Sequence, residues 1–501
     1  MPGVAVLAGR GAANAGGRAD GGALAIVLHT HMPYVEGFGT WPFGEEWLWE
    51  AIVGSYLPLL ELLDAGAPLT LSLTPVLCDQ LEAPGVHGRF TDFVEQVRRH
   101  THEEDAAGLR EGGHEQLARE VERSWSDYER ALRALSGRDG TLLDALAPHA
   151  QWTSSATHAV MPLLATDDGV RLQAQGGIDS HRARFGADTL KGAGWRGGFW
   201  LPECAHARRL EPLLADAGAH ATCVELTGRF GLGAREHLRP LTGDAGIVLV
   251  PIDRATMDLV WSDHGYPADD VYRDYHHHTV HHHTPWSIDG GVYDHARAQA
   301  KAREHAADFV ARTAARLRDG GRGLPGGGLA VCALDTELLG HWWYEGIDWL
   351  AAVVEECTRQ GLELVRLDDA LERLEPVPAS EWRGPPSQSA GEAGFGEDEL
   401  ASSWGAHGDL STWSGPAVAE VAFALRRAEL EVIAAGPRAG RLALRELLAL
   451  QSSDWAFMLA RGLAAPYASE RLALHKGALA RALADPQAVD PGAIRNLAGR
   501  L

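Results

Sequence analysis

The sequence is poor in cysteine and has no long apolar run. Its five cysteines are odd in number and include no CxxC pair (Cys78, Cys204, Cys223, Cys332 and Cys357). This spacing argues against a disulfide framework or a zinc site, and it predicts free, mostly buried thiols in a reducing cytoplasm. No stretch approaches the ~18 consecutive apolar residues that a membrane helix needs. We therefore expect a cytoplasmic protein that does not act in a membrane.

Positive charge is also scarce. Lysine and arginine together number 45, against 68 aspartates and glutamates, which gives a formal net charge of −23. A protein this acidic should repel a phosphate backbone, so the charge argues against nucleic acid as a substrate or partner. Binding of a neutral ligand is not affected by this charge.

The length of the chain and its composition suggest how it is divided. With 501 residues it is too long for one ordinary domain and fits a barrel with an added domain. Residues 1–22 are rich in Ala, Gly and Arg, and their one apolar patch is too short for a signal peptide, so we expect a disordered tail. The Pro-, Gly- and Ser-rich residues 376–400 predict a linker. It would separate a barrel, residues 23–375, from a helical C-terminal domain, residues 401–501.

Short apolar stretches alternate with helical patterns before the linker. The stretches that resemble strands are residues 23–28, 69–73, 149–153, 198–201, 219–226, 246–252 and 329–335. Alternation of this kind predicts an α/β fold with a mostly parallel sheet. Polar residues gather at the carboxyl ends of these strands, which favours a closed barrel over an open sheet.

Two of these strands end at a carboxylate. The aromatic run 197–202 leads to Glu203, and the apolar run 329–334 leads to Asp335. Two carboxylates at strand ends, with aromatic residues nearby, are the layout of an enzyme that acts on glycosidic bonds. Glu337 is a rival to Asp335, because alternate residues of a strand share one face.

Histidines and tryptophans cluster near the same strand ends. His29 and His31 project to one side of an extended chain; the alternative is a pair of solvated turn histidines. Trp41, Trp404 and Trp413 lie in glycine-containing loops, where a large aromatic ring is more often a contact surface than core. We expect such rings to stack on the apolar face of a sugar.

Two further polar segments call for an explanation. Residues 451–454 interrupt an apolar helical pattern over 442–462, and buried polar groups there need partners or a cavity. Histidine triplets occupy 276–278 and 281–283. A metal site is the less favoured interpretation, since adjacent histidines do not easily converge on one ion and no carboxylate or cysteine pattern completes a ligand shell. A solvated, pH-sensitive loop is favoured, and we assign no metal ligand.

Five stretches in order resemble the motifs of glycoside hydrolase family 57, and within it the branching enzymes that act on 1,4-α-glucans. They are His29–Tyr34 (HTHMPY), Trp200–Cys204 (WLPEC), Leu334–Trp343 (LDTELLGHWW), Ser403–Trp413 and Ser453–Trp455 (SDW). The match extends over nearly the whole chain from about residue 22. The stretch 29–60 is most similar to actinobacterial members, which are associated with glycogen or methylglucose-type polysaccharides.

The resemblance implies a distorted (β/α)7 barrel followed by a helical domain that completes the cleft, and a retaining mechanism on an α-glucan. It implies that Glu203 is the nucleophile and Asp335 the general acid/base. The residues implied to line the donor and acceptor sites are His29, His31, Trp41, Trp47, His158, Trp200, His341, Trp342, Trp404, Trp413 and Asp454. No cofactor is implied.

Physical chemistry agrees with the two catalytic roles. A retaining enzyme needs one ionised carboxylate to attack the sugar and one protonated carboxyl to assist the leaving oxygen. We expect Glu203 to stay ionised near His206 or other donors. The pKa of Asp335 should be raised by its apolar neighbours Leu334 and Trp342.

Two segments depart from the family pattern. One is the histidine-rich stretch 276–283, which in the family is usually more aromatic or aliphatic, and the other is the loop at 226–246. Branching members carry a tyrosine-tipped loop that is thought to keep water from the intermediate, but residues 226–246 contain no tyrosine. The alternatives are therefore an α-1,4-glucan hydrolase or a 4-α-glucanotransferase of the same family. A non-catalytic glucan-binding protein is disfavoured, because a degenerate member usually loses one of the carboxylates and this chain keeps both.

Overall fold

The computed structural model describes residues 21–39, 43–138, 140–186, 194–383, 401–485 and 496–500. Five strands form a parallel sheet in the order β4-β3-β2-β1-β8, and the short β9 also pairs with β1. Their bounds are β1 Ala23–Thr30, β2 Thr70–Leu73, β3 Ala150–Ser154, β4 Phe199–Trp200, β8 Leu329–Asp335 and β9 Glu363–Leu364. A second sheet has the order β5-β7-β6, with bounds Ala221–Val224, Val248–Pro251 and Leu241–Thr242.

The two sheets meet through isolated backbone contacts. Gly198 and Ala221 form a parallel bridge between β4 and β5. On the other side, the Asp253 N–H after β7 donates to the Val331 carbonyl of β8 over 2.8 Å. A Cβ at Gly198 would lie 2.2 Å from the Trp152 ring, so only glycine lets β4 pass Trp152 at this seam. The predicted parallel (β/α) fold is confirmed as a distorted barrel.

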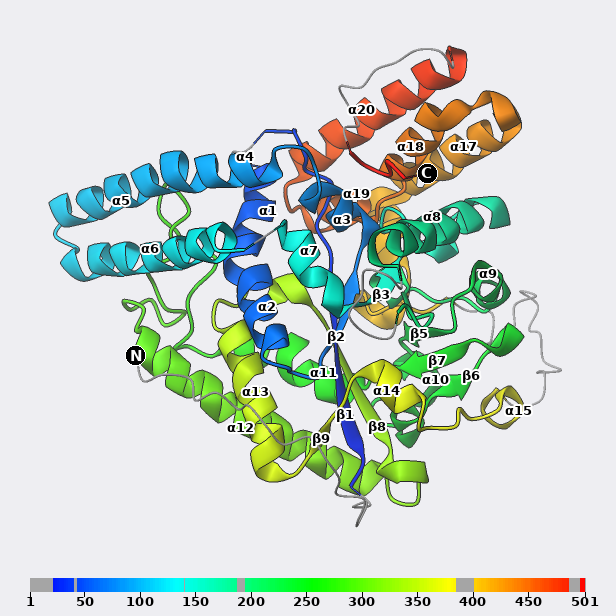
Figure 1. Cartoon of the computed structure of the whole chain (residues 1–501), viewed down its shortest axis with the longest axis horizontal. Coiled ribbons are helices and arrows are strands. Elements are labelled where there is room, and N and C mark those ends of the chain that lie inside the picture. The colour runs from blue at the N-terminus through cyan, green and yellow to red at the C-terminus, as the bar shows by residue number, and fades with distance from the viewer. Residues whose placement is uncertain are drawn as a thin grey trace.

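Helices surround these strands (Figure 1). In the first half of the barrel they are α1 Glu45–Ala51, α2 Leu57–Asp64, α3 Pro75–Leu81, α4 Val86–Asp92, α5 Arg99–Glu111, α6 Glu115–Ser136, α7 Leu142–Leu146 and α8 Asp167–Phe185. In the second half they are α9 Leu210–Ala217, α10 Thr227–Phe230, α11 Arg254–Trp261, α12 His295–Gly320, α13 Gly346–Gln360, α14 Leu367–Leu371 and α15 Ala379–Trp382. None of the described helices is long and apolar enough to span a membrane.

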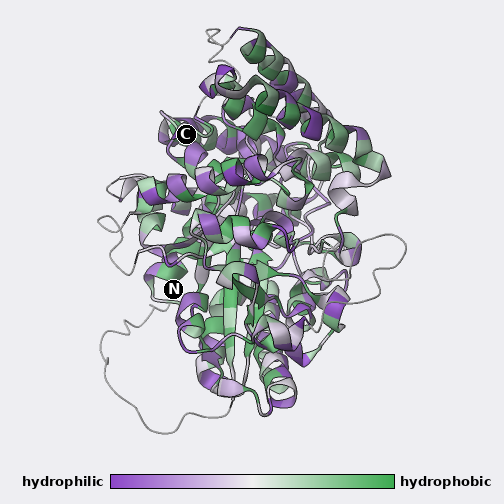
Figure 2. Cartoon of the chain, turned by 90° about the vertical axis from the view of Figure 1, so that its right-hand side faces the viewer, coloured by the Kyte–Doolittle hydropathy of each residue, from purple (hydrophilic) through white to green (hydrophobic). Residues whose placement is uncertain are grey.

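The core lies along β1 and β8. Leu24 to Leu28 and Ala330 to Leu334 are almost completely buried, which is the pattern of parallel strands covered on both faces. Figure 2 shows these hydrophobic strands in the centre of the molecule, with hydrophilic residues on the outer helices. Because His29 is the last residue but one of β1 and Asp335 is the last residue of β8, their positions are fixed by the core.

The helices α5 and α6 extend away from the barrel as a hairpin (Figure 1). The first histidine triplet, 276–278, is exposed, as expected for a solvated loop. The second differs, because His283 is buried and its Nδ1 lies 2.7 Å from Asp105 Oδ2 on α5, while His281 Nδ1 lies 2.8 Å from Oδ1. The loop is therefore docked on the hairpin through Asp105 and also through His102 of α5, whose Nδ1 lies 3.1 Å from His283 Nε2.

The C-terminal region is helical, as predicted. Its helices are α16 Ser411–Ser414, α17 Ala419–Ala435, α18 Gly440–Leu450, α19 Ser453–Arg461 and α20 Ala465–Ala484. The predicted continuous helix over 442–462 is wrong, because Gln451 and Ser452 separate α18 from α19. Ser452 pairs instead with Ala159 of the barrel in an antiparallel bridge. The polar cluster thus lies at a helix junction in contact with the barrel.

Helix α8 packs on β3 through Gly177. A Cβ at this position would lie 2.0 Å from the Ser154 carbonyl oxygen. We expect Gly177→Ala to lower the free energy of unfolding by about 1–3 kcal/mol, because backbone must move to accept the methyl group. Gly108→Ala in α5 is the matched control, since a Cβ there meets nothing within 4 Å. Thermal unfolding midpoints compare the two variants, and equal midpoints would contradict this packing.

Candidate active site

The candidate site lies where the carboxyl ends of the barrel strands meet the C-terminal helices. Side chains from six separate segments converge there. The barrel contributes His29 and His31 at the end of β1, His158 after β3, Glu203 after β4 and Asp335 at the end of β8. The C-terminal region contributes Trp404 from the loop before α16, and Ser453 and Asp454 from α19. Carboxyl ends of parallel strands are where barrel folds place their chemistry.

Glu203 occupies a strained backbone position. It follows β4 in the 3-10 turn Pro202–Cys204 with φ 63° and ψ 20°, and Cys204 also has a positive φ of 47°. A non-glycine residue in the left-handed region costs about 1–3 kcal/mol. Three backbone hydrogen bonds hold the turn. The Cys204 N–H donates to the Leu201 carbonyl over 2.9 Å, the Ala205 N–H to the Pro202 carbonyl over 3.0 Å, and the Trp404 N–H to the Glu203 carbonyl over 3.0 Å. Strain of this kind is typical of functional sites.

The Glu203 carboxylate accepts one hydrogen bond on each oxygen. The Trp404 indole Nε1–H donates to Oε2 over 3.0 Å, and the Ser453 hydroxyl donates to Oε1 over 2.8 Å. Burial raises the pKa of Glu203, and these two hydrogen bonds oppose that rise. The expectation that His206 keeps Glu203 ionised is wrong, because His206 Nε2 pairs with Glu211 Oε1 at 2.9 Å. The donors that favour the ionised form come from the helical region instead.

Asp335 has a different environment. It is the last residue of β8 and pairs in register with His29. Burial, followed by the nearby charges of Glu203, Glu337 and Asp454, raises its pKa well above the ordinary value. Within the described ranges its carboxyl group has no hydrogen-bond partner. Asp335 is therefore suited to hold a proton that it can donate, in the direction expected from the sequence.

Glu337 does not share the face of Asp335, because the strand ends at Asp335 and Glu337 lies in the 3-10 turn Thr336–Leu338. Its Oε1 accepts hydrogen bonds from the Tyr56 hydroxyl over 2.6 Å and from the His31 N–H over 3.1 Å. Burial raises the pKa of Glu337 to about 7. These contacts hold it as a structural acceptor.

Three histidines and a tryptophan form a stack between the strand ends. His29 lies 4.7 Å from the Trp200 ring at 15°, and His31 lies 3.8 Å from the His158 ring at 15°. Burial, followed by the charges of neighbouring histidines, lowers the pKa of both His29 and His158 well below the ordinary value. These two rings are therefore neutral at physiological pH.

His31 and Asp454 form a mostly buried ion pair. His31 Nε2 lies 3.0 Å and 3.2 Å from the two carboxylate oxygens of Asp454. Burial disfavours charge on both groups, but their attraction and hydrogen bonds outweigh it: the pKa of His31 is raised and that of Asp454 is lowered. Both directions agree with a charged pair. Asp454 and Ser453, from the polar segment 451–454, thus find the partners that buried polar groups need at the strand ends of the barrel.

His31, His158 and Asp454 each offer one ligand atom, and these atoms lie within 4.8 Å of one another. The two imidazoles are nevertheless stacked at 3.8 Å with their planes 15° apart. Nitrogen lone pairs lie in the ring planes, so two parallel rings do not converge on one ion. His31 Nε2 also already pairs with Asp454. This arrangement does not suit a metal ion.

The aromatic residues predicted to line the sugar sites form two separate groups, one around Trp404 and one around Trp342. Trp404 lies 5.1 Å from the Trp200 ring and 6.0 Å from the ring of Trp261, which is 37% exposed. Trp342 is 46% exposed and lies 4.5 Å from Tyr275; His341 also contacts Tyr275. Trp261 was not predicted, because it begins a segment without clear periodicity and lies outside the five motifs.

Two other tryptophans do not form open platforms. Trp47 packs edge-on against Phe43 and Tyr467 at 5.8 Å and 5.3 Å, and no contact with Glu203 or Asp335 is seen among the described residues. Trp413 is only 3% exposed, and its ring fills the space that a Cβ on Gly405 would need. The expectation of an exposed ring is therefore wrong for Trp413, and it is also wrong for Trp404, which is only 7% exposed. Trp41 lies outside the described residues.

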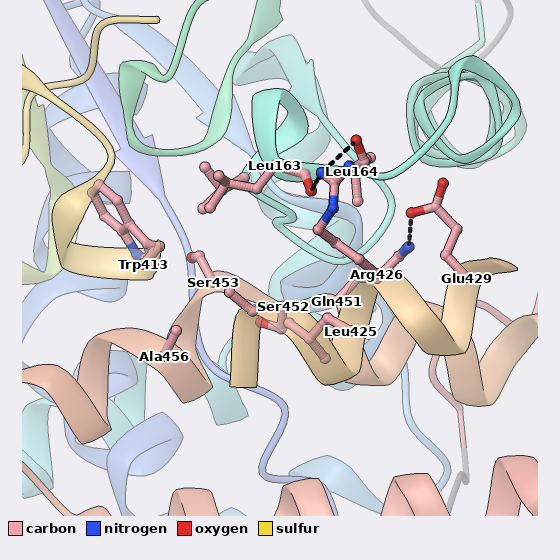
Figure 3. Close-up of a pocket in the computed structure, with 12 residues that line it drawn as sticks. Leu163, Leu164, Trp413, Leu425, Arg426, Glu429, Gln451, Ser452, Ser453 and Ala456 are labelled. Carbon is pink, nitrogen blue, oxygen red and sulfur yellow. Dashed lines mark hydrogen bonds between the residues drawn. The ribbon is translucent and has the colours of Figure 1, made fainter. Parts of the chain in front are cut away.

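Ser453 also borders a small cavity, shown in Figure 3. The cavity lies between the loop 160–164, α17 and the junction of α18 and α19, and its volume is about 30 Å³. That is room for about two water molecules, not for a sugar ring. Its rim is held by Gln451, which donates to Glu429 over 3.2 Å, and by Arg426, which donates to the Leu163 carbonyl over 2.8 Å.

Comparisons with known proteins agree on one family. The profile described as glycosyl hydrolase family 57 matches residues 152–379, and the profile described as 1,4-alpha-glucan branching enzyme, C-terminal, matches residues 420–495. A 1,4-alpha-glucan branching enzyme of Thermococcus kodakarensis is 31% identical over 91% of this chain and 72% of its own length.

Two further relatives match nearly end to end. A probable 1,4-alpha-glucan branching enzyme of Mycobacterium tuberculosis is 32% identical, and the alignment covers 91% of this chain and 90% of the relative. The crystal structure of a GH57-type branching enzyme from Pyrococcus horikoshii superposes with a TM-score of 0.80 at 28% identity, covering 96% of this chain and 93% of the other. The similarity thus includes both the barrel and the helical region.

The His31–Asp454 pair should make stability depend on pH. A raised His31 pKa adds stability that is complete below about pH 6.5 and is lost as pH rises through the folded-state pKa. A lowered Asp454 pKa adds stability that is present above about pH 4 and is lost at lower pH. Asp454→Asn should therefore destabilise the protein most near pH 5.5, by about 3–5 kcal/mol for a broken buried pair, and less at pH 9.

Thermal unfolding midpoints of the wild type and Asp454→Asn at the two pH values measure this difference. The double variant His31→Gln, Asp454→Asn is the control, because without either partner the extra pH dependence should disappear. An equal loss of stability at pH 5.5 and pH 9 for Asp454→Asn would show that the pair is not charged.

Proposed function

The chain belongs to glycosyl hydrolase family 57, and on this basis we propose that it is a retaining 1,4-α-glucan branching enzyme. It would cleave an α-1,4 bond and transfer the released chain to a glucan 6-hydroxyl, forming an α-1,6 branch. The observation that carries the proposal is the pair Glu203 and Asp335, two largely buried carboxyl groups. Among the described residues one has two hydrogen-bond donors and the other has none. The branching activity named for the relatives supports it.

In the first half-reaction, Asp335 gives its proton to the glycosidic oxygen while a carboxylate oxygen of Glu203 attacks the anomeric carbon. The bond from carbon to the leaving oxygen breaks, and a covalent glycosyl-enzyme forms. The proposed roles follow from the environments, since donors favour the anion at Glu203, whereas burial and neighbouring negative charge favour the acid form of Asp335.

In the second half-reaction, the Asp335 carboxylate takes the proton of the acceptor 6-hydroxyl. The acceptor oxygen then attacks the anomeric carbon, and Glu203 leaves as a carboxylate. Water in place of the acceptor would give hydrolysis. Hydrolysis is the alternative favoured by the missing tyrosine in residues 226–246, a segment tied to α15 by Arg229, which donates to the carbonyls of Trp382 and Arg383.

We assign the sugar contacts to the surfaces that remain open. The exposed rings of Trp261 and Trp342, with His341 beside Trp342, are proposed platforms for the glucan chain. His31 and Asp454, whose side chains remain partly exposed, would border the reacting glucose unit. His29, His158, Trp200 and Trp404 are buried and would act by holding the side chains beside them. Trp47 and Trp413 would act only by supporting neighbouring segments, given their packing.

The wider setting is also a proposal. We propose that residues 23–375 form the catalytic barrel, that 376–400 link it to the helical domain 401–501, and that the enzyme takes part in glycogen or related α-glucan synthesis. Most of the linker, residues 384–400, and the tail residues 1–20 lie outside the described residues. A cytoplasmic location fits the five cysteines, which are all free and buried.

Incubation with amylose tests the function. New α-1,6 linkages, followed by proton NMR, should rise far ahead of new reducing ends, because transfer makes a branch without releasing a reducing end to water. Glu203→Gln should abolish both signals while glucan binding persists. Reducing ends rising alone would identify a hydrolase, and turnover by Glu203→Gln would refute the assigned nucleophile.

Paired substitutions separate Asp335 from its rival. Asp335→Asn should lower kcat by about 10²–10⁴-fold, the usual contribution of general acid/base catalysis. Glu337→Gln should reduce activity much less, because the amide oxygen can still accept from Tyr56 and His31. Rates with a substrate whose leaving group needs no proton should recover in Asp335→Asn only. Recovery in Glu337→Gln instead would exchange the two roles.

A further inference from the structure

The hydrogen bond from Ser453 to Glu203 is the last link of a longer series. Ser453 Oγ lies 2.8 Å from His158 Nδ1, His158 Nε2 lies 2.8 Å from His29 Nε2, and His29 Nδ1 lies 3.3 Å from Ser72 Oγ. Every one of these side chains is buried. The series joins β2, β1, the loop after β3 and α19 to one oxygen of Glu203.

We propose that Ser72, His29, His158 and Ser453 form one directional hydrogen-bond chain that keeps the Glu203 carboxylate ionised and fixed in orientation. Ser72 and Ser453 are then positioning residues of the reaction. The inference rests on the proposed role of Glu203 as nucleophile and adds to it the residues that act through the two histidines.

The direction of the chain follows from the chemistry of its groups. An ionised carboxylate can only accept hydrogen bonds, so the Ser453 hydroxyl donates its hydrogen bond to Glu203. The Ser453 oxygen must then accept a hydrogen bond from His158 Nδ1–H. A neutral imidazole has one donor and one acceptor, so His158 Nε2 accepts from His29 Nε2–H. His29 Nδ1 then accepts from the Ser72 hydroxyl. Both histidine tautomers are thereby fixed.

The opposite direction has a different consequence. If the Ser72 oxygen accepted a hydrogen bond from His29, each later hydrogen bond in the chain would reverse. Ser453 would then donate to His158, and its oxygen would have to accept a hydrogen bond from a protonated Glu203. That direction therefore exists only with a protonated nucleophile, which cannot attack. A chain in the forward direction stabilises the ionised form of Glu203 against the cost of its burial.

The chain is built into the sheet. Ser72 and His29 are paired in register between β2 and β1, so their side chains leave the same face of the sheet. The His29 ring is held against Trp200, and the His158 ring against His31. All four ring nitrogens of His29 and His158 have protein partners, which assigns these histidines to Glu203 rather than to sugar hydroxyls.

Several titratable groups face Glu203 from the elements around it. His158 Nδ1 from the loop after β3 lies 3.9 Å from Oε1, His31 comes from the end of β1, Asp454 from α19 and Asp335 from the end of β8. The charges of His31 and Asp454 act in opposite directions on Glu203, and the substitutions below alter none of these four groups.

The pH profile of kcat/KM with amylose tests the chain. Its acid limb reports the ionisation of Glu203 in the free enzyme. Removing the hydroxyl in Ser453→Ala takes away a charge-assisted donor, so the limb should move to higher pH by about one unit. Ser453→Thr should restore it. Ser72→Ala, at the far end of the chain and four hydrogen bonds from Glu203, should move it in the same direction by a smaller amount.

Ser55→Ala is the matched control. Ser55 is fully buried beside Tyr56, and its hydroxyl has no partner among the described residues, so its removal should leave the acid limb in place. Equal profiles for Ser453→Ala and Ser55→Ala would overturn the chain. An inactive wild type, or an active Glu203→Gln, would instead overturn the proposed function.

A neutron crystal structure of the wild-type enzyme keeps the test independent of variant folding. The chain requires deuterium on His158 Nδ1 and on His29 Nε2, with His158 Nε2 and His29 Nδ1 bare. The opposite tautomers, or a charged ring with both nitrogens deuterated, would contradict it.

Discussion

The structure depends on how a largely buried carboxylate, Glu203 in the turn after β4, is stabilised. Isolation from water disfavours the charge of Glu203, and its backbone has a strained, left-handed conformation. Both costs are offset by hydrogen bonds from the Trp404 indole and the Ser453 hydroxyl. These two residues follow Glu203 in the sequence by 201 and 250 positions. The barrel alone therefore lacks the donors of its own candidate nucleophile, and the helical region completes the site.

The same surroundings set the two carboxyl groups apart. Hydrogen-bond donors converge on Glu203 and favour its ionised form. Asp335, at the end of β8, is shielded from water and lies near other carboxylates, which favour its protonated form. The three histidines of the stack also differ in charge. His31 pairs with Asp454 and is charged, whereas His29 and His158 remain neutral. Chemically similar side chains thus acquire different roles from their positions on rigid strands.

Local sequence predicts what is local in the fold. Apolar runs ending at Glu203 and Asp335 identified the strands and the candidate carboxylates, and helical periodicity identified the C-terminal region. Contacts between distant segments left no such signal: Ser72 is one small hydroxyl in an apolar strand, and His206 stands near Glu203 in sequence but pairs with Glu211. The break at Gln451–Ser452 was missed because the apolar helical pattern resumes directly after the polar residues 451–454. Glu337 could be separated from Asp335 only once the end of β8 was known.

The central claim is that Glu203 becomes covalently bound to the sugar during the reaction. The most direct measurement is to trap that species with a fluorinated α-glucosyl fluoride, which slows the second half-reaction, and to locate the label by peptide mass spectrometry. The account predicts one hexosyl label, on the peptide and side chain of Glu203. A label on Asp335 or Glu337, or steady turnover of the reagent with no covalent species, would contradict it.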